Sequence, residues 1–280
     1  MQQCTYNPTS NAARKSRSRT LKNSPQIGVV ITIHDQELLL AYEAQKKFSG
    51  VGTPLTYMFV GSGPADKIST IPNVIIARNL PNNIEDHKYL VDFTSWYALV
   101  RNNIPSQKYL ALIQYDVSIS QDFVDKSINA LSRAPMAVIG YAPMAMTDRN
   151  FIRDNMGYGP LKLACSAIYG IEIGPLLKSH IKLSGDKMWP TTNNVAMSRE
   201  TLEDFVRWFT PLAMHMGNEK PVGHAFERAI KLYCILSGRG NSYVSNVLSH
   251  FQMNSHETQD FRKDTSRLSR LLARNVMSQE

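Results

Sequence analysis

The sequence has no apolar run long enough to cross a bilayer. Crossing takes roughly 20 consecutive apolar residues, whereas runs such as Ile27–Ile33 end within a few positions, and the N-terminus has no apolar signal-peptide core. Cysteines are also few: Cys4, Cys165 and Cys234 form no CxxC pair and no zinc-binding spacing. We therefore expect a soluble, cytoplasmic protein with reduced thiols.

Acidic residues are absent from the first 25 positions, which carry much of the net charge of +8. The positive groups of this segment are Arg14, Lys15, Arg17, Arg19 and Lys22. A nucleic-acid-binding domain would carry its basic stripe on folded structure, so we predict no nucleic-acid partner. Arg/Ser-rich segments also serve as transit or nuclear signals, but we predict a disordered basic arm at residues 1–25.

From residue 27 onward, short apolar runs alternate with amphipathic ones. The run Ile27–Ile33 is rich in β-branched residues and predicts a buried strand, and residues 36–48 have the periodicity of a helix. Further strands are predicted at residues 56–60, 74–77, 108–115 and 137–141, helices at 89–102, 201–209 and 223–236, and a loop-rich stretch at 142–166. This alternation predicts an α/β fold with a mostly parallel central sheet flanked by helices.

The predicted domain organisation is a basic arm at residues 1–25, one α/β domain at 26–256 and a C-terminal amphipathic helix at 257–280. That helix has an apolar stripe with four arginines around it. We expect the stripe to pack on the domain, and peripheral contact with a membrane surface is the alternative.

Polar residues follow four of the predicted strands, and ligands of such sheets bind beyond the carboxyl ends of the strands. We expect these groups to converge on one edge: His34-Asp35, residues 61–66, Arg78 and Gln114-Tyr115-Asp116. At that edge, the carboxylate of Asp116 can hold Mg²⁺ or Mn²⁺, which prefer oxygen ligands. The alternative is that Asp116 caps a helix that begins near Gln121.

Several segments resemble the core of GT-A glycosyltransferases. They are the first strand through Asp35, residues 98–105 with the Arg101-Asn102 pair, the strand that ends at Gln114-Tyr115-Asp116, and residues 190–199 and 223–228. Within that class, the sequence is similar to glycosyltransferases of large algal viruses, among them a xylosyltransferase. The resemblance covers residues 25–255. It implies a GT-A-like, Rossmann-like fold, a UDP-sugar donor such as UDP-xylose, a glycan acceptor and a divalent metal.

The resemblance also assigns the donor and metal contacts. Asp116 takes the place of the second acid of the family's Asp-x-Asp motif and so is the expected metal ligand, with His250 as a second candidate. Gln114 stands where the family has the first acid, so it is expected to hydrogen-bond a ribose hydroxyl or a metal-bound water. This departure leaves metal independence open. Arg78 and Arg101 are expected to hold the diphosphate, although Arg101 could instead be a solvated cation that favours the helix C-terminal dipole. Thr32, His34 and Asp66 are expected to lie near the nucleobase.

On the acceptor side, Glu227 is expected to deprotonate the acceptor hydroxyl, as an inverting transfer requires. A retaining transfer is the alternative, because a single acid does not settle the stereochemistry. Glu227 could instead stabilise a helix N-terminus or pair with Lys231. Asp204 and Asp186 are weaker candidates for the base. The expected acceptor contacts are Trp189 as a stacking platform, Asn193, Asn194 and His224.

Two other functions fit parts of the sequence. A sugar-phosphate nucleotidyltransferase would share the strands, the metal and the nucleotide. It would also carry a glycine-rich phosphate loop after the first strand, where this chain has His34-Asp35-Gln36-Glu37. A non-catalytic nucleic-acid or glycan-binding protein would use the basic arm.

Overall fold

A computed structural model describes residues 27–44, 48, 52–84, 90–147, 149–153, 157–217 and 221–250. The predicted basic arm and the predicted C-terminal helix lie outside these residues, and so does Cys4. Within the described part of the chain, no helix is both long enough and apolar enough to span a membrane.

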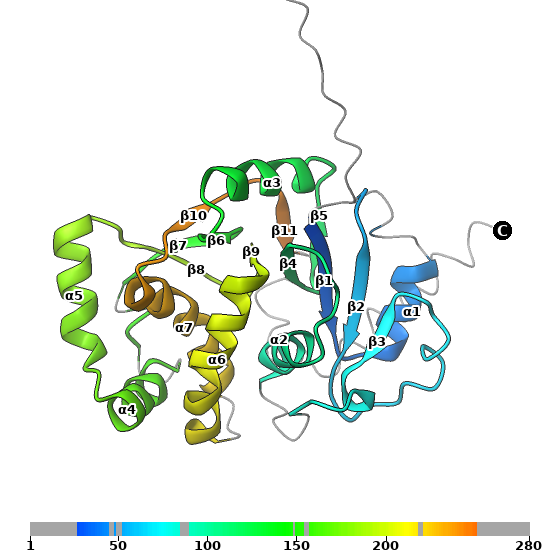
Figure 1. The fold of residues 1–280 in the computed structure, drawn as a ribbon, viewed down its shortest axis with the longest axis horizontal. Coiled ribbons are helices and arrows are strands. Elements are labelled where there is room, and N and C mark those ends of the chain that lie inside the picture. Colours follow the sequence, from blue (N-terminus) through cyan, green and yellow to red (C-terminus); the bar gives the residue numbers. More distant parts are fainter. Residues whose placement is uncertain are drawn as a thin grey trace, which may run out of the picture.

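A seven-stranded sheet forms the centre of the molecule (Figure 1). Its strand order is β10-β6-β9-β4-β1-β2-β3. The strands are β1 (Ile27–Ile33), β2 (Leu55–Phe59), β3 (Val74–Ile76), β4 (Tyr109–Gln114), β6 (Val138–Gly140), β9 (Val195–Ser198) and β10 (Asn241–Tyr243). Only β9 runs antiparallel to its neighbours in this sheet. The predicted α/β class and the mostly parallel sheet are confirmed.

Two small antiparallel pairs lie outside the main sheet. Strand β5 (Val117–Ile119) follows β4 after a tight turn and pairs with β11 (Leu248–His250), and β7 (Pro143–Ala145) pairs with β8 (Met188–Pro190). The β5–β11 pair returns the chain to the end of β4, where the polar residues predicted to form a site are located.

Helices cover both faces of the main sheet. Side chains along each strand alternate between the faces, and apolar side chains of β1 and β4 point to both, so each face is covered by helices. On one face, Val29 and Ile31 of β1 pack with α1 (Gln36–Ala44) and α3 (Phe123–Arg133). On the other face, Val30 and Leu112 pack with α2 (Val91–Arg101), α6 (Arg199–Met216) and α7 (Pro221–Ser237). A short 3₁₀ helix, η2 (Ala77–Asn79), follows β3.

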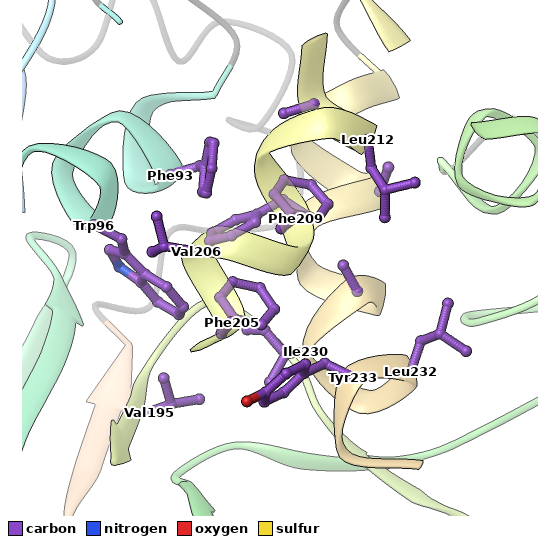
Figure 2. Packing of buried hydrophobic residues seen from close by; sticks show 14 of the residues in the cluster. Phe93, Trp96, Val195, Phe205, Val206, Phe209, Leu212, Ile230, Leu232 and Tyr233 are labelled. Carbon is purple, nitrogen blue, oxygen red and sulfur yellow. The ribbon is translucent and has the colours of Figure 1, made fainter. Parts of the chain in front are cut away.

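The second face is built around aromatic side chains (Figure 2). Phe205 and Phe209 stack nearly parallel with ring centroids 5.7 Å apart, and Trp96 of α2 contacts Phe226 of α7 edge-on at 4.8 Å. Edge-on and offset pairs of this kind are favourable beyond the area they bury. This cluster fixes α2 against α6 and α7, and these helices carry the residues of the site described below.

The loop-rich stretch predicted at residues 142–166 is wrong in its second half. Helix α4 (Tyr158–Tyr169) begins there and is followed by α5 (Ile173–Ser184). Gly157 precedes α4 with φ of 91°, a conformation that glycine adopts at little cost, and Pro160 occupies the first turn, where proline is favourable. The same Gly and Pro residues that suggested a loop therefore mark the start of a helix.

Candidate functional site

The polar residues predicted to converge lie together at the carboxyl edge of the sheet. Strands β1, β2, β3 and β4 are parallel, so their ends meet there. The ring of His34 contacts that of Tyr115 edge-on with centroids 5.0 Å apart. Arg78 Nη1 donates hydrogen bonds to the carbonyl oxygens of Gly61 at 2.9 Å and Gly63 at 2.7 Å. These contacts join the end of β1 to that of β4 and the end of β2 to that of β3.

Asp116 occupies the turn between β4 and β5 and is half-buried. Helix α3 begins only at Phe123, with β5 in between, so Asp116 does not cap it. The carboxylate of Asp116 raises the pKa of Tyr115 and Tyr42, in each case as a smaller effect than burial. The carboxylate of Asp116 therefore lies close to Tyr115 and Tyr42 at this edge of the sheet.

His34 lies close enough to respond to the same charge. Burial lowers the pKa of His34, although the carboxylates of Asp35 and Asp116 act in the opposite direction. The imidazole is therefore neutral at neutral pH. A neutral ring at this edge can hydrogen-bond or stack against a nucleobase.

The protein alone offers few ligands for a metal at Asp116. Among the residues that the structure describes, no group of three or more His, Cys, Asp or Glu could hold a metal ion. Strand β11 brings the backbone of His250 opposite Val117, the residue after Asp116. One carboxylate leaves most of the coordination sphere of Mg²⁺ or Mn²⁺ to other oxygen ligands, which water or a bound substrate would supply.

A second group of polar residues is organised by Asp92, in the first turn of α2, which the sequence reasoning missed. Asp92 Oδ2 accepts hydrogen bonds from Gln114 Nε2 at 2.8 Å and Asn193 Nδ2 at 2.6 Å. Burial raises the pKa of Asp92 to about 6; the two hydrogen bonds oppose this, and the carboxylates of Asp116 and Glu227 add to it. Asp92 therefore links the end of β4 electrostatically to α7.

The amide of Gln114 is held by protein groups on both of its sides. Its Nε2 donates to Asp92, and its Oε1 accepts from Asn194 Nδ2 at 3.4 Å. Asn194 Oδ1 also accepts from the backbone N–H of Gln114 at 2.7 Å. Gln114 thus cross-links α2 to the start of β9, an arrangement that differs from the ribose or metal-water contact expected for it.

These residues surround a cavity of about 160 Å³. Glu227 of α7 lines it, with Oε2 at 3.6 Å from His224 Nδ1 and 3.8 Å from Arg228 Nη1. Asn193 Oδ1 is buried and has no hydrogen-bond partner among the described residues. The full lining is Leu90, Val91, Asp92, Gln114, Asn193, Gly223, His224, Phe226 and Glu227. The structure therefore brings together four of the expected residues, Gln114, Asn193, His224 and Glu227.

The alternative roles considered for Glu227 do not apply. Glu227 is in the second turn of α7, which begins at Pro221, and Lys231 pairs with Asp186 and with Asn241 Oδ1 at 2.9 Å instead. Asp186 is engaged in that pair. Asp204 is bound by Arg207 at 3.1 Å and by Arg239, so both weaker candidates for the base have structural roles.

The buried guanidinium of Arg228 holds α7 in position. It donates to the carbonyl oxygens of Phe151 at 2.7 Å, His224 at 2.8 Å and Asn150. It also lies over the ring of Trp189, 5.2 Å from its centroid. Trp189 is 2% exposed and contacts Phe151, so it belongs to the core and offers no open face for a sugar.

Three other expected residues lie apart from the cavity. Arg101 is at the last turn of α2, about 14 Å along the helix from Asp92, and its guanidinium lies over Tyr97. Thr32 is 3% exposed and pairs in register with Gln114, so it presents almost no surface to a nucleobase. Asp66 is exposed in the segment after β2.

Asp92 could have been found from topology. A helix that connects two parallel strands begins at the edge where the first strand ends. The first residues of α2 must therefore lie near the end of β4, whereas its last residues lie at the opposite edge. The same reasoning places Arg101 away from the site.

Comparison with solved structures identifies the fold. The chain superposes on WbbM, a bifunctional glycosyltransferase, with a TM-score of 0.52 and 11% identity over 82% of this chain. It spans 46% of the WbbM chain, less than half of its length. The chain therefore has the α/β fold of GT-A glycosyltransferases.

Two further structures show lower similarity. Glucosyl-3-phosphoglycerate synthase from Mycobacterium tuberculosis, in complex with Mn²⁺ and UDP-glucose, has a TM-score of 0.41 and 14% identity, covering 84% of this chain and 74% of its own. A glycosyltransferase involved in glycosylation of the major capsid of PBCV-1 has a TM-score of 0.41 and 11% identity, covering 85% and 100%. No protein-family model and no curated protein sequence matches the chain.

Proposed function

We propose that this chain is a glycosyltransferase that moves a sugar from a UDP-sugar to a hydroxyl group of a glycan acceptor. The observation that carries the proposal is the adjacency of two half-sites at the end of β4. Tyr115 contacts the ring of His34 on one side, and its neighbour Gln114 bonds to Asp92 at the wall of the cavity on the other, with Asp116 following directly. A donor bound at Asp116 would therefore have its sugar next to the cavity that contains Glu227.

The donor half of the site binds the nucleotide and its diphosphate. Arg78, anchored to the carbonyl groups of Gly61 and Gly63, supplies positive charge at the ends of β2 and β3. His34, neutral and packed against Tyr115, contacts the base. Arg101, Thr32 and Asp66 have no part in this assignment because of their positions. The resemblance to the algal-virus enzymes favours UDP-xylose as the donor.

A divalent metal, Mn²⁺ or Mg²⁺, fits this half of the site when a donor is present. Asp116 would be its ligand from the protein, with His250 on the adjacent strand as a second candidate. When bound, the metal neutralises charge on the departing diphosphate. Because one carboxylate is a weak site, we expect little metal binding without the nucleotide.

The acceptor half of the site positions a hydroxyl group for attack. Asn193 Oδ1, which has no partner among described residues, can accept a hydrogen bond from a sugar hydroxyl. Glu227 takes the proton of the attacking hydroxyl as the general base, and His224 and Arg228 hold its carboxylate in place. Asp92 acts as a positioning residue because it orients Asn193 and Gln114. Direct displacement of the diphosphate by a hydroxyl group that Glu227 deprotonates inverts the anomeric carbon, and NMR of the product tests this.

The experiment is a panel of UDP- and GDP-sugars, scored for slow hydrolysis and for transfer to simple glycosides, with and without Mn²⁺. We expect hydrolysis of a UDP-sugar that Mn²⁺ stimulates and that Asp116→Asn lowers by a factor of about 100 or more. The matched control is Asp122→Asn, which removes an exposed carboxylate that pairs with Lys126 at 2.7 Å.

A non-catalytic glycan or nucleic-acid binder would behave differently. It would hydrolyse no nucleotide-sugar in the panel, and deletion of residues 1–25 would abolish ligand binding. The transferase should retain hydrolysis after that deletion. Hydrolysis by Asp116→Asn at the rate of the unmodified chain would remove the assignment of the metal to Asp116.

A further inference from the structure

A second cavity lies at the opposite end of β9. Its volume is about 480 Å³, and its lining is Ser106, Gln107, Lys108, Pro135, Met136, Ser198, Arg199, Glu200 and Glu203. Ser198 pairs with Tyr109 at the start of β4, whereas Asn194 bonds to Gln114 at its end. The two cavities are thus on opposite edges of the sheet, and nothing in the proposed transfer reaction uses the second one.

The guanidinium group of Arg199 has no hydrogen-bond partner among the described residues at this cavity. All three of its guanidinium nitrogens are buried, and none has a hydrogen-bond partner among the residues that the structure describes. A buried charged group without a partner is strongly unfavourable, and buried polar groups in proteins are almost always satisfied by protein, water or an ion. The position of Arg199 is fixed because its backbone N–H donates to the carbonyl of Lys108 at 2.9 Å.

Other features at the cavity favour an anion that also has a hydrogen-bond donor. Lys108 adds a second cation, and the site is at the N-terminus of α6, an 18-residue helix whose dipole is positive at that end. Gln107 Oε1 is buried and lacks a partner in the described part of the chain. Pro135 and Met136 provide an apolar wall.

Within the chain, Glu203 is the acidic residue that would compete with a bound anion for the guanidinium of Arg199. It is one turn further along α6, and its carboxylate raises the pKa of Arg199, opposing the lowering by burial. No ion pair joins the two side chains. Glu200 is directed elsewhere, with Oε1 at 3.9 Å from Arg239 Nη2.

We propose that this cavity binds the carboxylate or phosphate group of a small organic anion. Arg199 is the principal donor to the anion, Gln107 accepts a hydrogen bond from a hydroxyl or N–H group of the ligand, and Pro135 and Met136 contact its apolar part. This site is independent of the proposed transferase site.

The test uses the full chain and three probes: inorganic phosphate, hexyl phosphate and hexanoate. Calorimetric titration should detect saturable binding of at least one of them. Arg199→Met should weaken that binding by about tenfold or more, the loss expected for a hydrogen bond to a charged group. The matched control is Arg207→Met on the same helix, because Arg207 is exposed and pairs with Asp204; binding should be unchanged.

Two further variants separate the outcomes. Arg199→Lys keeps the charge but loses the planar guanidinium. Its affinity for the anion should therefore lie between those of the unmodified chain and Arg199→Met, and it provides a test even if Arg199→Met folds poorly. Glu203→Gln removes the competing acid and should tighten anion binding. A preference for hexyl phosphate or for hexanoate identifies the anionic group, and either supports the site.

Other results would overturn the proposal. Absence of binding by all three probes would do so, as would equal binding by Arg199→Met and the unmodified chain. Loss of thermal stability in Glu203→Gln with no change in anion binding would identify Glu203 as the partner of Arg199.

Discussion

Replacement of Asp92 by asparagine should stabilise the fold while it impairs the proposed reaction. Burial raises the pKa of Asp92 from 3.8 to about 6. The folded chain therefore binds this proton more tightly than the unfolded chain, so the stability contributed by this group is greatest at low pH. It falls as the pH rises from about 4 to about 6.

The magnitude follows from the size of the shift. A displacement of about two pKa units corresponds to about 3 kcal/mol of cost for the ionised group at pH 8, as an upper value. Asparagine has the shape of aspartate, and its single oxygen can accept the hydrogen bonds from Gln114 and Asn193. Asp92→Asn should therefore raise the free energy of unfolding by up to about 3 kcal/mol at pH 8 and change it little at pH 4.

Urea denaturation followed by circular dichroism, repeated from pH 4 to pH 8, measures this difference. Asp122→Asn is a control of opposite sign. Hydrogen bonds from Lys126 and Ser120 lower the pKa of Asp122, so the control should lose stability at neutral pH, and the loss should disappear as the pH falls through the folded pKa. Equal destabilisation of Asp92→Asn at every pH would refute the argument. Sugar transfer by this variant should fall because a neutral amide oxygen holds Asn193 and Gln114 less strongly than a carboxylate oxygen does.

Other predictions test single elements of the account. Glu227→Gln should lower sugar transfer by a factor of about 100 or more while UDP affinity in calorimetry is nearly unchanged; retained transfer would disqualify Glu227 as the base. Arg78→Met should weaken UDP binding by about tenfold, and Arg101→Met should leave UDP binding unchanged. Equal losses of UDP affinity in both variants would contradict the assignment of the diphosphate to Arg78 alone. Gly157→Ala should destabilise the fold by about 2 kcal/mol or more, because its Cβ would lie 2.3 Å from the backbone nitrogen of Ala225 and because φ at Gly157 is 91°. Unchanged urea denaturation would show that this contact is easily relieved.

The strands of the first half could be predicted because buried strands consist of short runs of apolar, mostly β-branched or aliphatic residues. Ile27–Ile33 is buried at every position and was predicted with the same bounds, and the strand predicted at 108–115 is β4, Tyr109–Gln114. Helix α4 was missed because its flanking Gly157 and Pro160 also occur in loops. The apolar positions that identify it, Leu161 and Cys165, are buried against α6 and α7, a contact that only the fold defines.

The site could be predicted only in part. Residues at strand ends, such as His34 and Asp116, were located because parallel topology brings strand ends together. Asp92 was missed because an acid in the first turn of a helix normally serves the helix dipole. Trp189 and Arg101 were assigned to the site from their position beside recognised motifs. In the structure, Trp189 is buried in the core, and Arg101 lies at the far end of α2 from the site.

The most direct test of the central claim is a crystal structure of the chain with UDP and Mn²⁺. We expect the diphosphate and the cation at Asp116, the uracil beside His34, and the open end of the diphosphate directed toward the cavity that contains Asp92 and Glu227. Nucleotide bound at the cavity of Arg199, or a cation with no contact to Asp116, would contradict this claim.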